Sequence, residues 1–186
     1  GQSSFRAFIW QDGLMEHLAD PGVAESYAYG INDAGLIVGW ARALDPSTHP
    51  QHACIWENGV ITDLNPGMIY SGGEVFDVNG LSHFVGYSPM FGGGQEAVGW
   101  FAGPEGGRTP LGSLGGNYTR PYAINDLDQV VGASYTADSA PHSHPFLWQN
   151  GEMSDLGLLP GRIAGIAYAI NNSGQIVGSE FLWEAG

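Results

Sequence analysis

Short apolar segments alternate with polar turns along the whole chain, and none has the apolar spacing of a helix. One stretch occurs four times: YGINDAGLIVG at 29–39, FDVNGLSHFVG at 76–86, YAINDLDQVVG at 122–132 and YAINNSGQIVG at 168–178. In each copy apolar residues flank a polar turn rich in Asn, Asp and Gly, which is typical of a β-hairpin. The pattern therefore predicts an all-β chain built from repeats.

A second hairpin motif follows the first, and its apolar residues end in Trp before a tight turn, as in ACIWENG and PFLWQNG. Aligning the copies places four tryptophans in one column: Trp10, Trp56, Trp100 and Trp148. The asparagines of the first motif form another column: Asn32, Asn79, Asn125 and Asn171. The asparagines stand 47, 46 and 46 residues apart, and turn residues divide each repeat into four strands. A four-stranded unit of this length is typical of a β-propeller blade.

We therefore expect a single domain, residues 1–186, folded as a four-bladed β-propeller. The repeat units are 26–64, 73–111, 119–156 and 165–186, and the last holds only its first two strands. Residues 5–18 contain the missing hairpin, so we expect them to complete the fourth blade and close the ring, which would remove exposed strand edges. The terminal FLWEAG, 181–186, resembles a further copy of the third strand, and we expect it to pack elsewhere or to support self-association.

The first strand of each repeat alternates bulky and small side chains. Its aromatic column is Tyr29, Phe76, Tyr122 and Tyr168. We expect these rings, and the tryptophans, to pack between blades, with a ring that stacks on a ligand as the alternative. Asp77 replaces a small residue in this strand, which suggests a carboxylate facing the channel.

Charge narrows the choice of partner. The chain has 19 acidic and five basic residues and a net charge of −14, which argues against nucleic acid. No apolar segment is long enough to span a membrane. Cys54 is the only cysteine, and its apolar neighbours indicate a small core residue.

Three segments, HACIWENGVITDL at 52–64, PLGSLGG at 110–116 and YAINNSGQIVG at 168–178, together carry a recognisable composite motif. This motif resembles the HAF family of bacterial extracellular repeats. The resemblance covers nearly the whole chain and implies a repeat architecture in a secreted or cell-surface protein, without a defined reaction. The chain departs from the motif's Asp at His17 and Pro110 and from its His at Arg6 and Glu96. We therefore expect the motif residues that are present to form hydrogen bonds that stabilise blades and not one catalytic set: His52, Asp63, His144 and Asp155.

The long connections, among them 43–52, 88–96 and 134–144, should all lie at one end of the blades, because antiparallel strands alternate direction. We expect ligand binding there. Glu74 and Arg120 occupy equivalent positions in two repeats, where Tyr27 and Ile166 stand in the others. The candidate ligand-binding residues are Tyr27, Glu74, Asp77, Tyr118, Arg120, His142 and His144.

Three functions remain open. The first is an extracellular module that binds a glycan or another surface component, with no cofactor. The second is a hydrolase or lyase that uses His142, His144 and a carboxylate, with or without a divalent metal. The metal-binding alternative comprises His49, His52, His142 and His144. The third function is a structural spacer in a larger surface assembly.

Overall fold

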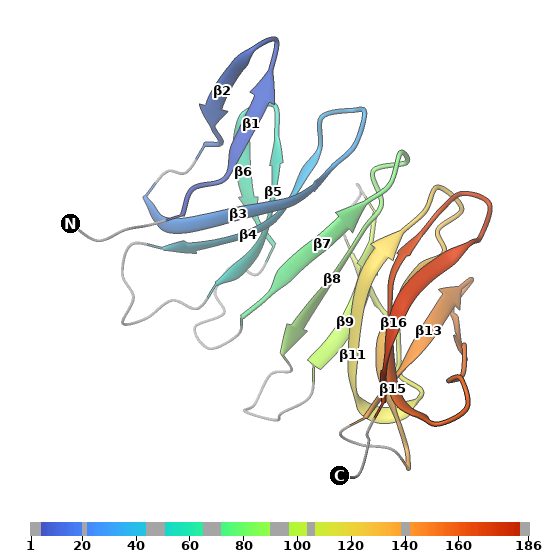
Figure 1. The fold of residues 1–186 in the computed structure, drawn as a ribbon. Coiled ribbons are helices and arrows are strands. Elements are labelled where there is room, and N and C mark those ends of the chain that lie inside the picture. The colour runs from blue at the N-terminus through green and yellow to red at the C-terminus, as the bar shows by residue number, and fades with distance from the viewer. Residues whose placement is uncertain are drawn as a thin grey trace.

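The computed structural model describes residues 5–19, 22–43, 51–64, 72–89, 97–103, 107–138 and 142–182. All secondary structure in these residues is β-strand, which confirms the all-β prediction. The strands form several small antiparallel sheets that follow one another through the molecule (Figure 1). Within the described residues there is no helix of the length and apolarity needed to cross a membrane.

The described residues form sixteen strands, and their order follows the repeat. An N-terminal hairpin comes first: β1 (Phe8–Gln11) and β2 (Leu14–His17). The first complete repeat contains β3 (Val23–Ile31), β4 (Ile37–Ala43), β5 (His52–Glu57) and β6 (Val60–Asp63). The second contains β7 (Glu74–Val78), β8 (Phe84–Pro89), β9 (Ala97–Ala102) and β10 (Arg108–Pro110). The third contains β11 (Gly115–Ile124), β12 (Val130–Thr136), β13 (Ser143–Gln149) and β14 (Glu152–Asp155). The last has β15 (Arg162–Ile170) and β16 (Ile176–Leu182).

Each complete repeat is a four-stranded antiparallel unit in which neighbours in sequence are neighbours in the sheet. The parallel pair Tyr118–Ala97 joins β11 to β9, so the second and third units form one continuous sheet. Three of the turns between third and fourth strands are two-residue turns with positive φ at both positions, as a type I′ hairpin requires: Asp12–Gly13, Asn58–Gly59 and Asn150–Gly151.

The repeated motif ends in glycine for a steric reason. The register of every first hairpin shifts opposite this glycine, so the first strand carries a β-bulge at the aromatic residue. A Cβ on Gly132 would collide with the carbonyl oxygen of Arg120, and one on Gly39 with that of Tyr27. The bulge thus brings the two backbones so close that only glycine fits.

The asparagine of the motif also has a defined role. The Asn125 Oδ1 atom accepts hydrogen bonds from Leu127 N and Gln129 N, both 3.0 Å long, and so shapes its own turn. Its Nδ2 atom donates to the carbonyl oxygen of Asn171 in the next repeat over 3.0 Å. Asn32 and Asn79 each make the same contact with the following asparagine, at 3.0 Å and 2.9 Å. We call this series of four residues the asparagine ladder.

The apolar core lies between successive units. Four clusters of buried residues separate the N-terminal hairpin from the first repeat and each repeat from the next. The cluster between the second and third repeats contains Phe146, Val85 and Val130, which are fully buried. Cys54 is buried in the first cluster, as expected, and burial raises the pKa of its thiol to about 12.

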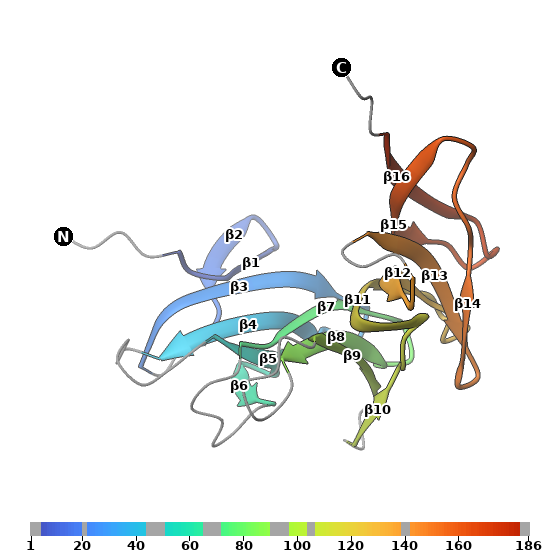
Figure 2. The same ribbon diagram turned by 90° about the horizontal axis from the view of Figure 1, so that it is seen from below.

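The N-terminal hairpin does not complete the last sheet. β1–β2 and β15–β16 form separate two-stranded sheets, and Figures 1 and 2 show them at opposite ends of the array. The expected closure by a shared blade is therefore wrong for the described residues. The first hairpin packs instead on the first repeat, where Ala7 is buried against Ile37 and Trp56.

A repeated backbone contact explains this position. Ser26 N donates to the carbonyl oxygen of Phe5 over 3.1 Å, just as Gly73 N donates to that of Gln51 over 3.0 Å. The start of β1 therefore lies beside the start of β3 in the same way as the start of β5 lies beside the start of β7. The hairpin is the second half of a unit that comes before the first complete repeat.

The tryptophan column also needs a correction. Gly39 pairs with Cys54 and Gly132 with Phe146, but Gly86 pairs with Trp100. Trp100 therefore takes the place of Cys54 and Phe146, two residues away from the predicted column. β9 and β10 are also joined by a longer connection, residues 103–107, than the two-residue turns of the other hairpins. Trp56, Trp100 and Trp148 are buried as predicted, whereas Trp10 is exposed.

The C-terminal segment differs from the prediction in part. Phe181 and Leu182, assigned to a further third strand, form the end of β16. Residues 183–186 lie outside the described part of the chain.

The turns of all four repeats nevertheless meet. Ile31, Val78, Ile124 and Ile170, with the residues that follow them, surround a hollow of about 390 Å³. The ends of the first strands thus gather around a common space, and the described strands do not form a closed ring.

Candidate functional site

An arginine held among aromatic rings lies in the middle of β11, before the asparagine turn that follows Ile124. The Arg120 Cζ atom is 4.6 Å from the ring centroid of Phe76, 5.0 Å from that of Tyr87 and 5.6 Å from that of Tyr122. Its Nη2 atom is 3.2 Å from the Glu74 Oε2 atom. These five residues come from β7, β8 and β11, and we call them the arginine cluster. Each ring attracts the guanidinium through its negative face.

Strand geometry assembles this cluster. Glu74 and Phe76 of β7 both contact the Arg120 guanidinium, and Tyr122 of β11 lies beside it, although the two rings stand at the bulges of their strands. Tyr87 pairs directly with Glu74 across β7 and β8. Neighbouring repeats therefore contribute an acid and a base at the same position of the same face.

The pair is partly buried. The side chain of Arg120 is 30 % exposed and that of Glu74 13 %. Gln51 Nε2 donates to the second carboxylate oxygen of Glu74 over 2.6 Å and fixes its orientation. Among the described residues the only acceptor that Arg120 contacts is Glu74, and its buried Nε atom has none. Most of the guanidinium donors are thus not used by the described protein groups.

Tyrosine hydroxyls complete the surroundings. Burial raises the pKa of Tyr122 to about 12, and the nearby Tyr118 adds to this increase. Tyr118 stacks on Tyr135 with ring centroids 4.7 Å apart. Burial alone would lower the pKa of Arg120, but Tyr122 and then Glu74 raise it, with a net increase. The site therefore presents a permanent cation, a fixed carboxyl group and neutral phenols.

The arginine cluster is part of a longer line of rings. Tyr29, Phe76, Tyr122 and Tyr168 contact one another in succession, with ring centroids 5.9, 5.7 and 5.5 Å apart and interplanar angles of 21°, 41° and 65°. We call these four residues the aromatic row. Contacts between neighbouring repeats agree with the packing interpretation, yet the two end rings remain half exposed. The aromatic row thus packs between repeats and also leaves part of its rings accessible to solvent.

Tyr27 and Asp77 are candidate residues that make other contacts than those of the arginine cluster. Tyr27 belongs to the first repeat, where it stacks on Trp40 with centroids 4.6 Å apart. Both Asp77 oxygens accept backbone hydrogen bonds of 2.9 Å, from Val78 N and Ile124 N. Asp77 therefore joins β7 to β11, and burial raises the pKa of its carboxyl group.

The histidines are not brought together either. His144 Nδ1 is 2.8 Å from Asp155 Oδ2, and His52 Nδ1 is 2.7 Å from Asp63 Oδ2. Each pair joins the third and fourth strands of its own repeat, as the motif predicted. His142 is exposed beside β13, and His49 lies outside the described residues. In the described part of the chain no group of three or more His, Cys, Asp or Glu side chains could hold a metal ion.

Sequence reasoning found Glu74, Tyr118 and Arg120 but missed Tyr87 and Gln51. Tyr87 occupies the position of Trp40 in the first repeat. A large aromatic residue at this position of the second strand, next to small residues, could have identified it from the sequence. Comparison of the chain with family models, with curated proteins and with solved structures found no match.

Proposed function

We propose that this protein is a binding module and that the arginine cluster, with the aromatic row, binds a glycan. The single observation that carries the proposal is the arrangement of Arg120 and Glu74, which stand side by side on a surface of aromatic rings. Sugar rings offer apolar faces to aromatic side chains and hydroxyl groups to charged donors and acceptors. The cluster supplies both kinds of contact within one small area.

The variation between repeats supports this choice. The rings of the aromatic row recur in every repeat, whereas Glu74 and Arg120 replace Tyr27 and Ile166 at one position. A symmetric scaffold needs no ion pair at that position, because the first and last repeats form the same hairpin without it. The ion pair is therefore consistent with a binding site on a repeat scaffold that folds without it.

Glycan-array capture followed by calorimetry on a captured glycan tests the proposal. We expect Glu74→Gln and Arg120→Met each to weaken binding about ten-fold or more, since each removes a charged hydrogen-bonding group. Arg42→Met is the matched control, because Arg42 forms a similar pair with Glu25 at 3.4 Å beside Trp40 in the first repeat. Glycan capture that survives the double change at Glu74 and Arg120 would contradict the proposal.

The setting of this module is part of the same proposal. The resemblance to HAF repeats supports a secreted or cell-surface protein. The four turns around the hollow of about 390 Å³ support a propeller-like arrangement of the repeats.

A further inference from the structure

Three Asn-Gly pairs occur in the chain, at 58–59, 79–80 and 150–151. Asparagine is a chemically labile residue, and its reaction requires the backbone nitrogen of the next residue to reach the side-chain carbonyl carbon. A glycine in that next position leaves its nitrogen open to this approach, because glycine has no Cβ. The three pairs therefore share one chemistry, and the fold decides which of them can react.

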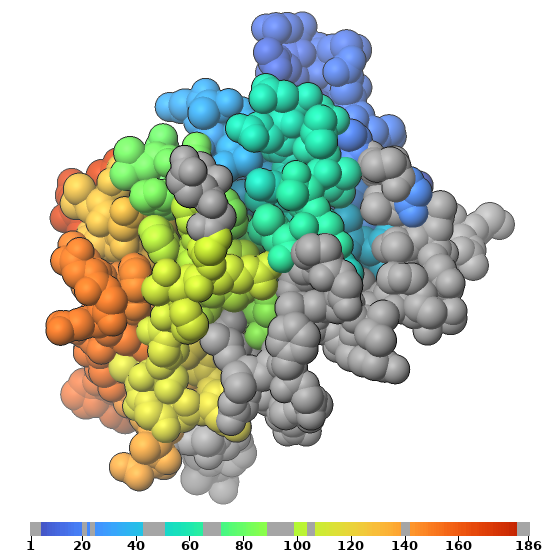
Figure 3. Space-filling view, turned by 180° about the vertical axis from the view of Figure 1, so that it is seen from behind, coloured from blue at the N-terminus to red at the C-terminus, as the bar shows by residue number. Residues whose placement is uncertain are grey.

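Two of the pairs form exposed hairpin turns. Asn58–Gly59 joins β5 to β6, and Asn150–Gly151 joins β13 to β14. All four residues are exposed, and a Cβ added to either glycine would meet nothing within 4 Å. Seen from behind, the β5–β6 hairpin (teal) and the β13–β14 hairpin (orange) both reach the surface, at separate places (Figure 3). Water can therefore reach both turns.

The described part of the chain gives these two turns few hydrogen bonds. Among the described residues, the two asparagine side chains form no hydrogen bond, and neither do the backbone nitrogens of the glycines that follow them. Strand pairing on either side closes each turn, between Glu57 and Val60 and between Gln149 and Glu152. Short exposed turns of this kind open locally at low cost in free energy.

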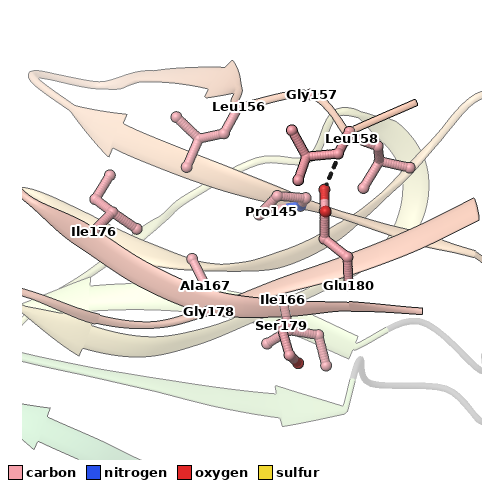
Figure 4. A pocket seen from close by; sticks show the side chains of 11 residues that line it. Pro145, Leu156, Gly157, Leu158, Ile166, Ala167, Ile176, Gly178, Ser179 and Glu180 are labelled. Carbon is pink, nitrogen blue, oxygen red and sulfur yellow. Dashed lines mark hydrogen bonds between the residues drawn. The ribbon is translucent and has the colours of Figure 1, made fainter. Parts of the chain in front are cut away.

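The turn at 150–151 also stands clear of the large hollow beside the last hairpin. β14 runs from this turn to Leu156, which with Leu158 and Ile176 lines a hollow of about 500 Å³ (Figure 4). The turn and the hollow thus lie at opposite ends of β14, and the residues that line the hollow do not include those of the turn. Packing around the hollow therefore does not restrain Asn150.

The third pair, Asn79–Gly80, belongs to the asparagine ladder and is held on all sides. The Asn79 Oδ1 atom accepts hydrogen bonds from Leu81 N over 3.0 Å and from His83 N over 2.9 Å. Its Nδ2 atom donates to Asn125 O and to Asp128 Oδ1, both over 2.9 Å. Asn79 is also only 4 % exposed. The carbon that would be attacked is therefore fixed in place.

The attacking atom of this pair is engaged as well. Gly80 N donates to Asp126 Oδ1 over 2.7 Å. This hydrogen bond, followed by one from Asn172 Nδ2, lowers the pKa of the Asp126 carboxyl group, because both bonds stabilise its charged form. Gly80 N must lose this partner before it can attack Asn79. The fold thus restrains both reacting atoms at 79–80 and neither of them at 58–59 or 150–151 within the described residues.

We propose that Asn58 and Asn150 are sites of spontaneous deamidation in the folded chain, whereas the turn of Asn79 protects it. A base takes the proton of the glycine N–H, the nitrogen attacks the asparagine Cγ atom, and a new C–N bond forms. The side-chain amide group takes a proton from water and leaves as ammonia. Water then opens the resulting succinimide ring at one of its two carbonyl carbons, which gives aspartate or isoaspartate.

The two products differ in their effect on the fold. Asp12 stands at the equivalent position of the β1–β2 turn with φ 54°, the same value as Asn150, so an aspartate fits the type I′ turn. Isoaspartate routes the main chain through the side-chain carbonyl and adds one backbone atom, so the two-residue turn no longer closes in the same register. Isoaspartate therefore loosens a hairpin that carries the buried Trp56 or Trp148.

Peptide mapping by mass spectrometry tests the proposal on the full chain, incubated at mildly alkaline pH below its unfolding temperature. We expect Asn58 and Asn150 to convert to aspartate and isoaspartate about 100-fold or more faster than Asn79, because several hydrogen bonds must open before Asn79 reacts. In urea that unfolds the chain, the three pairs should react at similar rates. Conversion at Asn58 and Asn150 that is as slow as at Asn79 in the folded chain overturns the proposal. So does a difference that persists unchanged in urea, because it would then come from the sequence and not from the fold.

Asp126→Ala tests the protection of Asn79 separately. Asp126 is exposed, and its loss frees Gly80 N, so the rate at Asn79 should rise about ten-fold or more while the rate at Asn58 stays the same. Asp33→Ala is the matched control, since Asp33 is exposed at the equivalent position of the first repeat, and it should change none of the three rates. Circular dichroism confirms that both variants keep their β structure. An Asn79 that stays inert in Asp126→Ala overturns the assigned protection.

Discussion

The asparagine ladder gives the sharpest test of what holds successive repeats together. Asn125 and Asn171 make the same contacts within their own turns, where each Oδ1 atom accepts two backbone N–H groups and each Nδ2 atom donates to a Gln. Only Asn125 also donates to the next repeat. Changing each to Asp keeps the acceptor and removes the donor, so the difference between the two variants isolates the contact between repeats.

The expected magnitude follows from burial. Asn125 is 4 % exposed, and in Asn125→Asp a carboxylate oxygen faces the carbonyl oxygen of Asn171. Losing one hydrogen bond costs about 1 kcal/mol net, and a polar group left buried without its partner costs about 1–3 kcal/mol. We therefore expect Asn125→Asp to lower the free energy of unfolding by about 2–4 kcal/mol. Asn171→Asp is exposed and should cost about 1 kcal/mol or less.

Urea unfolding followed by circular dichroism measures the free energy of unfolding of both variants. The difference of about 1–3 kcal/mol corresponds to roughly 2–12 °C in Tm for a chain of this size. Asn125→Ala and Asn171→Ala repeat the comparison without an added charge. Equal losses of stability in both pairs would refute the argument, because the bond between repeats would then contribute nothing measurable.

Two further predictions concern the backbone and pH. Gly132→Ala should lower the free energy of unfolding by about 3 kcal/mol, since a Cβ there collides with Arg120 O and lies 2.8 Å from Phe146 Cε1. Gly72→Ala, which places its Cβ 3.6 Å from Gln51 Cγ, should change stability by less than about 0.5 kcal/mol in the same urea assay, and similar losses would contradict the bulge interpretation. Burial raises the folded-state pKa of Asp77 above its ordinary value of 3.8, so its contribution to stability is complete below pH 3.8 and declines as pH rises through the folded pKa. Urea midpoints measured across this range should fall more for the unchanged chain than for Asp77→Asn, and parallel curves would count against the assignment.

Local patterns predicted the repeat, the strands and the turns because these depend on residues close in sequence. The Asn-rich turns and the Asp12–Gly13 type of hairpin need particular backbone angles, which few residues adopt. Pairing of the two chain ends was a different kind of prediction. It followed from counting strands, but the first hairpin is placed by a local backbone contact, Ser26 N to Phe5 O, which no periodicity records.

Only part of the candidate site was predicted from the sequence. Glu74 and Arg120 were found because a repeat makes an unusual residue visible at a fixed position. Asp77 stood out by the same criterion, yet its carboxyl group bonds two backbone amides. Sequence alone cannot separate the two cases, since the direction of a side chain at a β-bulge depends on local register. The shift of Trp100 by two residues has the same origin in register.

The repeat separates residues that build the scaffold from residues that are free to carry function. The motif glycines are required by close backbones, and the two central ladder asparagines, Asn79 and Asn125, are buried. Changing the glycine costs stability within its own repeat, and changing the asparagine also removes a bond to the next repeat. The position of Tyr27, Glu74, Arg120 and Ile166 has no such requirement, because four different side chains are accommodated on the same backbone. Binding can therefore change at this position without loss of the fold, and the only oppositely charged pair it could hold lies where two neighbouring repeats present Glu74 and Arg120 together.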